Sequence, residues 1–154
     1  MKERDEPVFD GMEPGGRGEP ASPPVRERIR ALAQGQPYGV LCVQGEGQPY
    51  GALVAFAFTP DLRHLVFATP RATRKFRLLS RSDRVALVVD NRPDKRGAFM
   101  EIEAVTLTGR ARLVEGGEAW ERWAALLLGR HPYLEAFVRA PTSALFRVET
   151  VRML

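Results

Sequence analysis

The sequence contains a single cysteine and two histidines among its 154 residues, and this scarcity removes several kinds of chemistry. Cys42 cannot form an intramolecular disulfide, and its apolar neighbours predict a buried thiol. His64 has no second histidine, cysteine or carboxylate at ligand spacing, so we expect a surface histidine. We therefore expect neither a disulfide framework nor a metal site.

Long apolar segments are also missing. No run of residues approaches the length of a membrane span, and the first six residues, Met-Lys-Glu-Arg-Asp-Glu, lack the apolar core of a signal peptide. Hydrophobic residues nevertheless make up 44% of the chain, which is enough for one domain with its own core. We expect a soluble, cytoplasmic protein with no membrane partner.

The first 23 residues differ from the rest of the chain in composition. They are rich in proline and glycine and carry few large apolar side chains, so they cannot form a core. We expect a flexible N-terminal tail over residues 1–23 and a single folded domain over residues 24–154.

The apolar pattern of the folded domain is mainly that of β-strands. A glycine-containing turn at residues 44–49 predicts a hairpin, and Gly109 predicts a bulge inside a long strand. Gly129 is expected to end one helix, and Tyr133 to lie on the buried face of the next. Hairpin neighbours and apolar strand edges favour a mainly β (α+β) fold, a small closed or split antiparallel barrel with peripheral helices. Strands are expected at residues 38–43, 50–58, 64–68, 84–90, 99–113 and 143–154, and helices at 25–33, 72–80, 118–128 and after His131.

The strand at residues 50–58 is apolar on both faces, which is unusual for a half-exposed sheet. Small side chains at Gly51, Ala52, Ala55 and Ala57 leave room for a flat ligand or a second subunit to lie against the backbone. A barrel strand with tight interior packing is the structural alternative.

Positive charge is concentrated in one segment, although the net charge of the whole chain is only +4. Residues 71–84 contain six cations and one carboxylate, Asp83, and several of the cations fall at the start of the helix predicted over residues 72–80. Cations at a helix N-terminus cost about 0.3–1 kcal/mol each, and a bound anion would reverse the sign. The hydroxyls of Thr69 and Thr73 and a guanidinium could then converge on a phosphate. A solvated helix face is the alternative, and single-stranded nucleic acid is a weaker one because base-stacking aromatics are scarce in the segment.

The order of these segments resembles the pyridoxamine 5′-phosphate oxidase-like FMN-binding split-barrel proteins, over residues 25–154. The resemblance implies a split β-barrel with FMN as cofactor, in a homodimer that holds flavin at the subunit interface. It implies that Thr73, Arg74 and Lys75 bind the FMN phosphate, next to Ala68 and Thr69 at the end of the preceding strand. It also implies that Ala52, Leu53, Val54 and Ala55 lie along the isoalloxazine edge. The matching segments are residues 39–43, 48–54, 65–75, 84–90 and 105–114.

The chain departs from the vitamin oxidases of this family at its C-terminal end. Those enzymes hold the substrate phosphate with a Trp- and Arg-containing segment that residues 146–154 do not reproduce. The resemblance is therefore to a subgroup of general flavin-nucleotide-binding proteins. We expect a flavin-dependent oxidoreductase of unknown substrate, with no catalytic acid or base identified and no nucleic-acid partner. The alternative is a non-catalytic protein that binds flavin or haem for storage or sensing.

Overall fold

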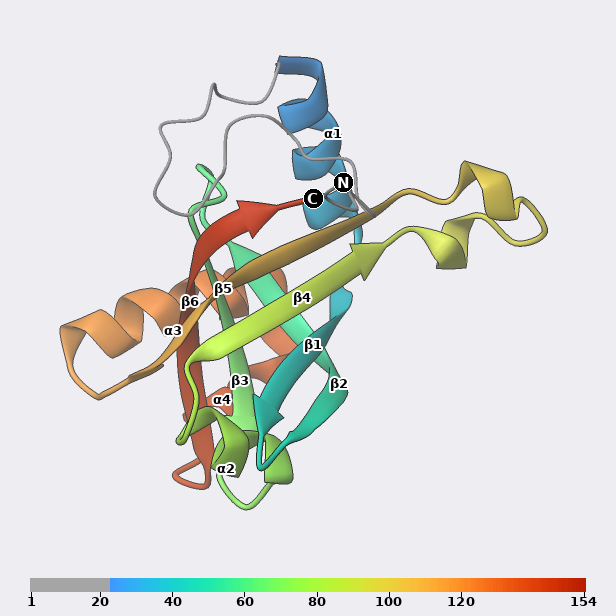
Figure 1. The fold of residues 1–154 in the computed structure, drawn as a ribbon. Helices are drawn as coiled ribbons and strands as arrows, with labels where there is room; N and C mark the ends of the chain where they lie inside the picture. The colour runs from blue at the N-terminus through green and yellow to red at the C-terminus, as the bar shows by residue number, and fades with distance from the viewer. Residues whose placement is uncertain (1–22) are drawn as a thin grey trace.

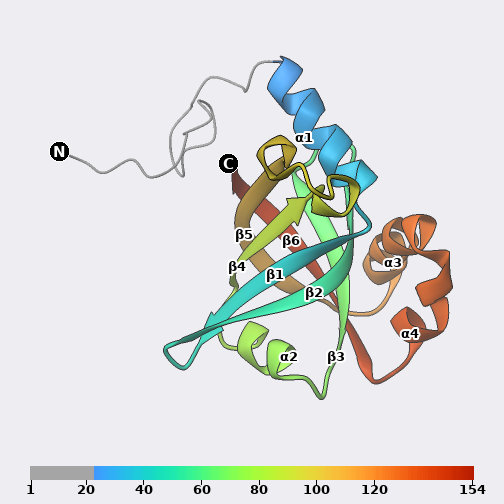
Figure 2. The same ribbon diagram turned by 90° about the vertical axis from the view of Figure 1, so that its right-hand side faces the viewer.

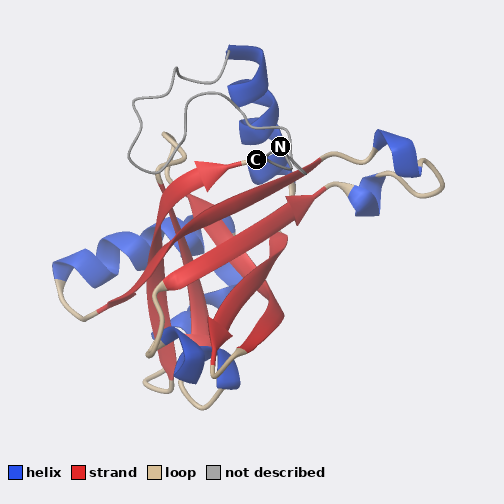
Figure 3. Cartoon of the chain, in the orientation of Figure 1, coloured by secondary structure: helices blue, strands red, loops and turns tan. Residues whose placement is uncertain are grey.

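The computed structural model describes residues 23–154, which form a closed antiparallel barrel of six strands in the order β1-β2-β3-β6-β5-β4 (Figure 1). The predicted mainly β antiparallel barrel with peripheral helices is confirmed (Figure 3). The tail predicted over residues 1–23 lies outside the described residues except for Pro23, which begins the first helix. The strands are β1 (Tyr38–Gly45), β2 (Gln48–Phe58), β3 (His64–Pro70), β4 (Arg84–Asp90), β5 (Ala104–Val114) and β6 (Ser143–Met153). The helices are α1 (Pro23–Gly35), α2 (Arg74–Leu79), α3 (Glu118–Arg130) and α4 (Glu135–Arg139), with 3₁₀ turns η1 (Arg92–Asp94), η2 (Phe99–Glu101) and η3 (Pro132–Leu134).

Two apolar clusters hold the fold together. Alternate residues of every strand point into the barrel, where Leu41, Phe56, Phe67 and Leu107 are fully buried. A second cluster lies outside the barrel, where α3 and α4 pack on the outer faces of β2, β3 and β6 (Figure 2). Helices therefore cover one side of the barrel wall, and the outer faces of β1 and β4 carry no described helix (Figure 1).

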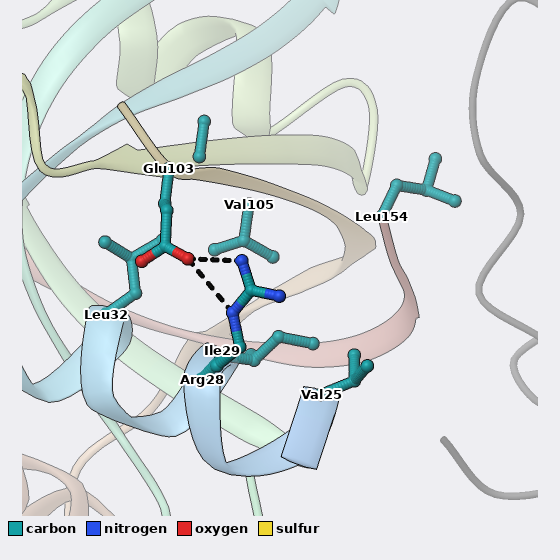
Figure 4. A pocket seen from close by; sticks show the side chains of 8 residues that line it. Val25, Arg28, Ile29, Leu32, Glu103, Val105 and Leu154 are labelled. Carbon is teal, nitrogen blue, oxygen red and sulfur yellow. Dashed lines mark hydrogen bonds and ion pairs between the residues drawn. The ribbon is translucent and has the colours of Figure 1, made fainter. Parts of the chain in front are cut away.

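Helix α1 lies across one end of the barrel, and its C-terminus is held by one side chain from α3. The Arg130 guanidinium donates to the carbonyl oxygens of Ala33 at 2.7 Å, Gln34 at 2.9 Å and Gln36, and lies 5.0 Å from the centre of the Phe56 ring. These bonds satisfy carbonyl groups that a helix end leaves unpaired. On the other face of α1, Arg28 pairs with Glu103 beside a small apolar pocket (Figure 4).

The strand predicted over residues 99–113 is wrong in its first part. β5 begins at Ala104, and Phe99–Glu101 form the turn η2 in an arm that projects beyond the barrel between β4 and β5 (Figure 1). Phe99 and Met100 are 81% and 91% exposed. The reason is that the partner strand β4 ends at Asp90, opposite Ala104, so residues 99–103 have no strand to pair with. Alternation alone could not reveal that limit.

Several smaller expectations also need correction. Gly129 does not end α3, which continues to Arg130 and stops where Pro132 cannot continue it. Tyr133 is 63% exposed instead of buried, because it lies in the short turn η3 before α4. Cys42 is half-buried, because its side chain lies on the outer face of β1.

The bulge predicted at Gly109 is confirmed. The β5–β6 register shifts between Thr108 and Gly109, and a Cβ atom built on Gly109 would lie 2.5 Å from the carbonyl oxygen of Glu149. Only a glycine fits between the two backbones at this point.

Candidate functional site

The barrel wall is interrupted between β2 and β3. β2 pairs with β1 from Gln48 to Ala55, but its pairing with β3 is confined to residues 56–58 opposite residues 65–67. On the N-terminal side of Phe56, the edge of β2 that faces β3 has no ladder partner among the described strands. Free N–H and C=O groups along a strand edge are strong hydrogen-bonding groups that require partners. We call this interruption the seam.

Residues predicted to bind the cofactor lie on both rims of the seam. Ala52, Leu53, Val54 and Ala55 belong to the unpaired edge of β2, and Ala68 and Thr69 belong to β3 beyond its last pair with β2. Val54 points into the barrel and is buried, whereas Leu53 is 68% exposed on the outer face. The structure thus brings together two segments of the sequence around one opening with a polar backbone edge.

Two hydroxyls organise the turn that follows β3. Thr73 is the N-cap of α2: its hydroxyl accepts from the Phe76 N–H at 3.2 Å and donates to the Pro70 carbonyl at 2.8 Å. The Thr69 hydroxyl, which is fully buried, lies 3.2 Å from the Thr73 oxygen and therefore donates to it. The predicted helix began at Ala72, but this cap places its start at Arg74 and leaves Ala72 exposed. In this arrangement the Thr73 hydroxyl shapes the turn, and its contact with a phosphate stays a prediction.

The cations of residues 71–84 have different surroundings, which the sequence did not reveal. The Arg71 Nε donates to the Ser143 carbonyl at 3.2 Å, so Arg71 ties this turn to β6. Arg77 and Arg81 both pair with Glu46, which comes from the β1–β2 hairpin. Glu46 was missed because it lies far away in the sequence, with no local signal. Arg74 makes no ion pair in the described structure, and its guanidinium lies 5.6 Å from the centre of the Tyr50 ring at the start of β2. Arg74 therefore lies between the α2 turn and the β2 rim of the seam.

Lys75 has the most unusual environment of these cations. It is only 9% exposed, and no carboxylate or hydrogen-bond acceptor pairs with it within residues 23–154. Burial lowers the pKa of Lys75 from its ordinary value, because water is removed from the charged ammonium group. A buried cation without a partner costs free energy unless an anion is supplied. The turn at the start of α2 therefore carries charged donors, Arg74 and Lys75, of the kind that an anionic group such as a phosphate requires.

Three hollows of the described surface lie away from this turn. None of the three main ones includes residues 73–75; one, of about 490 Å³, reaches Leu53 on the outer face of the barrel. Within residues 23–154 no group of three potential metal ligands comes together, and no helix is long and apolar enough to cross a bilayer.

Comparison with known proteins places these features in a family. The sequence profile of the family described as pyridoxamine 5′-phosphate oxidase matches residues 25–153. No curated protein sequence matches the chain significantly.

Solved structures share the fold at low sequence identity. A protein of unknown function from Agrobacterium tumefaciens is similar with a TM-score of 0.72 and 20% identity, over 86% of this chain and 57% of that one. A FAD-binding protein from Mesorhizobium loti has a TM-score of 0.68 and 18% identity, over 83% of this chain and 89% of that one. A haem-binding protein from Mycobacterium smegmatis has a TM-score of 0.75 and 19% identity, over 87% of this chain and 54% of that one. This chain thus spans little more than half of the Agrobacterium and Mycobacterium proteins.

The family profile covers nearly all the described residues, from α1 through β6, and includes both rims of the seam and the α2 turn. On this ground the chain belongs to the pyridoxamine 5′-phosphate oxidase family.

Proposed function

We propose that the protein is an FMN-binding oxidoreductase from the general flavin-nucleotide-binding part of its family, with a substrate other than the vitamin. The observation that carries the proposal is the seam: a free backbone edge of β2 lies near a turn that presents an unpaired, buried lysine. A flat ring with a polar edge and a phosphate tail is the kind of ligand that satisfies both features at once.

The residues divide into those that hold the phosphate and those that hold the ring. Arg74 and Lys75 supply the charged donors for the phosphate, and Thr73, with Thr69 behind it, fixes the turn that presents them. Residues 52–55 offer their backbone to the ring edge, while the small side chains of Ala52 and Ala55 allow close approach. A bound flavin would supply hydride-transfer chemistry, and the protein would supply binding, orientation and exclusion of water.

A homodimer belongs to this proposal. The outer faces of β1 and β4, and of β2 from Gly51 to Ala55, present mainly small or apolar side chains, and no described helix packs over this part of the barrel (Figure 1). A second copy on this face would supply a further wall for a ring held between the two rims of the seam. The outward-facing side chains are Val40, Cys42, Gly51, Leu53, Ala55, Ala86 and Val88.

A second candidate is a non-catalytic protein that binds flavin or haem. The fold likeness to a haem-binding protein from Mycobacterium smegmatis supports it. Anaerobic addition of a reduced nicotinamide cofactor discriminates between the two candidates: bleaching of the bound flavin supports an oxidoreductase, and unchanged flavin absorption supports a carrier.

The direct test is reconstitution with FMN, followed by visible absorption and fluorescence. Wild-type protein is expected to bind FMN, and Arg74→Ala to weaken that binding by about tenfold or more, because a charged hydrogen bond contributes about 1.5–3 kcal/mol. Riboflavin, which lacks the phosphate, should lose little affinity. Arg81→Ala, which removes a cation already paired with Glu46, is the matched control. Equal losses for FMN and riboflavin would mean that Arg74 does not bind the phosphate.

A further inference from the structure

β2 changes its partner strand part of the way along its length. Its residues 48–55 pair with β1 and its residues 56–58 pair with β3, so no residue of β2 has a paired strand on both sides. The change leaves two gaps in the barrel wall, one on each side of β2. The seam is the gap on the β3 side. The second gap lies on the β1 side of Phe56, at a level where β1 has not yet begun.

The backbone groups of β2 point alternately toward these two gaps. The Thr59 N–H, just after β2, donates to the His64 carbonyl of β3 at 2.9 Å. In an antiparallel ladder the N–H and C=O of one residue point to the same side of the strand, and the side alternates from each residue to the next. Counting back from Thr59, the groups of Leu53 and Ala55 therefore face the seam, and those of Phe56 face the second gap.

The residue that follows α3 fills the second gap. If β1 began one residue earlier in the same register, Pro37 would lie opposite Phe56, but proline has no N–H to donate. The Phe56 carbonyl oxygen lies instead 2.9 Å from Nε2 of His131. A carbonyl oxygen carries no proton, so Nε2 is the donor. His131 is only 2% exposed, which shields this hydrogen bond from water.

The imidazole of His131 is itself held in place. The backbone N–H of His131 donates to the Leu127 carbonyl at 2.9 Å, and its Nδ1 lies 3.2 Å from the hydroxyl of Tyr133. The preceding residue, Arg130, binds the carbonyls at the end of α1 and lies against the Phe56 ring. His131 is therefore a fixed donor that ties the end of α3 to the backbone of β2.

The fold treats the two gaps differently. The second gap is closed by protein, whereas β3 offers no ladder partner to Leu53 or Ala55, whose groups face the seam. The two gaps meet at consecutive residues, Ala55 and Phe56. A movement of the Phe56 carbonyl would therefore also move the neighbouring groups that face the seam.

We infer that His131 is a positioning residue for the flavin ring. By holding the Phe56 carbonyl, it fixes β2 at the point where this strand leaves β3, and so sets the place of the free groups of Leu53 and Ala55. His131 acts through the backbone of β2 and not by contact with the ring. The inference rests on the proposed function, because the seam is the site assigned there to the flavin.

The test compares His131→Phe, which keeps a flat ring without a donor, with His131→Gln, whose amide can donate to the Phe56 carbonyl. FMN and riboflavin affinities are measured by flavin fluorescence on the full-length protein. His131→Phe is expected to weaken both flavins alike, by about five- to tenfold, because part of the binding free energy is then used to restore the position of β2, up to the value of one hydrogen bond. His131→Gln should recover most of this loss.

Val138→Ala is the matched control for a loss of packing alone. Val138 is buried in α4, within the apolar cluster outside the barrel, and its side chain cannot donate a hydrogen bond. This variant should lower the melting temperature and leave both flavin affinities unchanged. The inference is overturned if His131→Phe behaves in the same way, or if His131→Gln loses as much flavin affinity as His131→Phe.

A measurement on the wild-type protein does not depend on the folding of a variant. In the nitrogen NMR spectrum of histidine-labelled protein, the neutral form of His131 should carry its proton on Nε2. A proton on Nδ1 would contradict the hydrogen bond to Phe56 and, with it, the positioning role.

The two proposals fail in different ways. If the wild-type protein binds neither flavin, the flavin assignment is wrong and the positioning role falls with it, although the Nε2 proton and a higher melting temperature of His131→Gln than of His131→Phe would still show the anchor on Phe56. If FMN binds to the wild type and His131→Phe binds both flavins equally well, the positioning role is wrong and the flavin site stands.

Discussion

Lys75→Met is expected to weaken FMN binding by about tenfold or more and, at the same time, to make the cofactor-free protein more stable. Lys75 is buried without a partner, so at neutral pH the folded protein bears the cost of removing water from its charge. Methionine has a similar length and no charge, and should raise the free energy of unfolding by on the order of 1 kcal/mol. The phosphate of FMN loses a charged donor, which accounts for the weaker binding. A residue that served stability alone would not show a gain in stability together with a loss of FMN affinity when it is replaced.

The measurements are fluorescence titrations with FMN and riboflavin, together with urea unfolding of the cofactor-free protein. Riboflavin affinity should stay close to that of the wild type. Arg77→Met, on the same helix but exposed, is the control and should leave both properties nearly unchanged. Unchanged FMN affinity in Lys75→Met would show that the buried lysine does not bind the phosphate.

The pH dependence of stability gives an independent check on Lys75. Burial lowers its pKa in the folded protein, whereas in the unfolded chain it titrates near the ordinary value of 10.5. Between these two values the unfolded state binds more protons, so this group makes stability rise as pH increases. At pH values below the pKa of Lys75 in the folded protein, the full free-energy cost of burying its charge is present. Lys75→Met should therefore remove a rise in stability on the alkaline side, seen as a smaller difference between the variant and the wild type as the pH approaches 10.5.

Gly109→Ala is expected to destabilise the protein by about 1–3 kcal/mol, which lowers the melting temperature by several degrees. A methyl group at this position would lie 2.5 Å from the Glu149 carbonyl oxygen and 2.6 Å from a methyl group of Val148, so β5 and β6 would have to separate at the bulge. These two strands are neighbours in the barrel wall. The contact with the Glu149 carbonyl oxygen involves backbone atoms, so rotation of a side chain cannot relieve it.

Gly129→Ala is the matched substitution with the opposite sign. Gly129 lies inside α3, and no atom outside the helix lies within 4 Å of the position where its Cβ would stand. Alanine in an open helix position should stabilise the fold by about 0.5–1 kcal/mol. Thermal unfolding of both variants checks the pair; equal effects would show that the close contact at Gly109 relaxes without cost.

Local patterns in the sequence were sufficient where neighbouring residues decide the structure. The apolar run at residues 84–90 predicted β4 with the bounds that the structure has, because β-branched residues and alternating burial are properties of the strand itself. The hairpin turn contains Glu46 and Gly47 at positive φ, and a glycine-rich stretch predicts such a turn without knowledge of the fold. The arm around Phe99 and Met100 was mistaken for strand because its pattern alternates while its partner strand has already ended.

The candidate site shows the same division. The cations and hydroxyls of residues 69–75 were singled out from the sequence, since a local excess of charge is visible there, but the cap at Thr73 was not predicted. Their different environments could not be predicted: Arg77 and Arg81 pair with Glu46 from a distant hairpin, and Arg71 donates to the Ser143 carbonyl at the start of β6. The connection between Tyr38, Tyr133 and His131 joins β1 to η3 across more than ninety residues and left no signal in the sequence.

The sequence by itself therefore predicted the main part of each strand, most helix positions and the cluster of cations and hydroxyls at residues 69–75, because each of these depends on side chains within a few positions of one another. Tertiary structure alone decided that β2 pairs with β3 only over residues 56–58, that Lys75 is buried without a partner in the described structure, and that the hydroxyls of Tyr38 and Tyr133 meet. Pairing, burial and these contacts are set by atoms that come from distant parts of the chain, and they exist only once the barrel has closed.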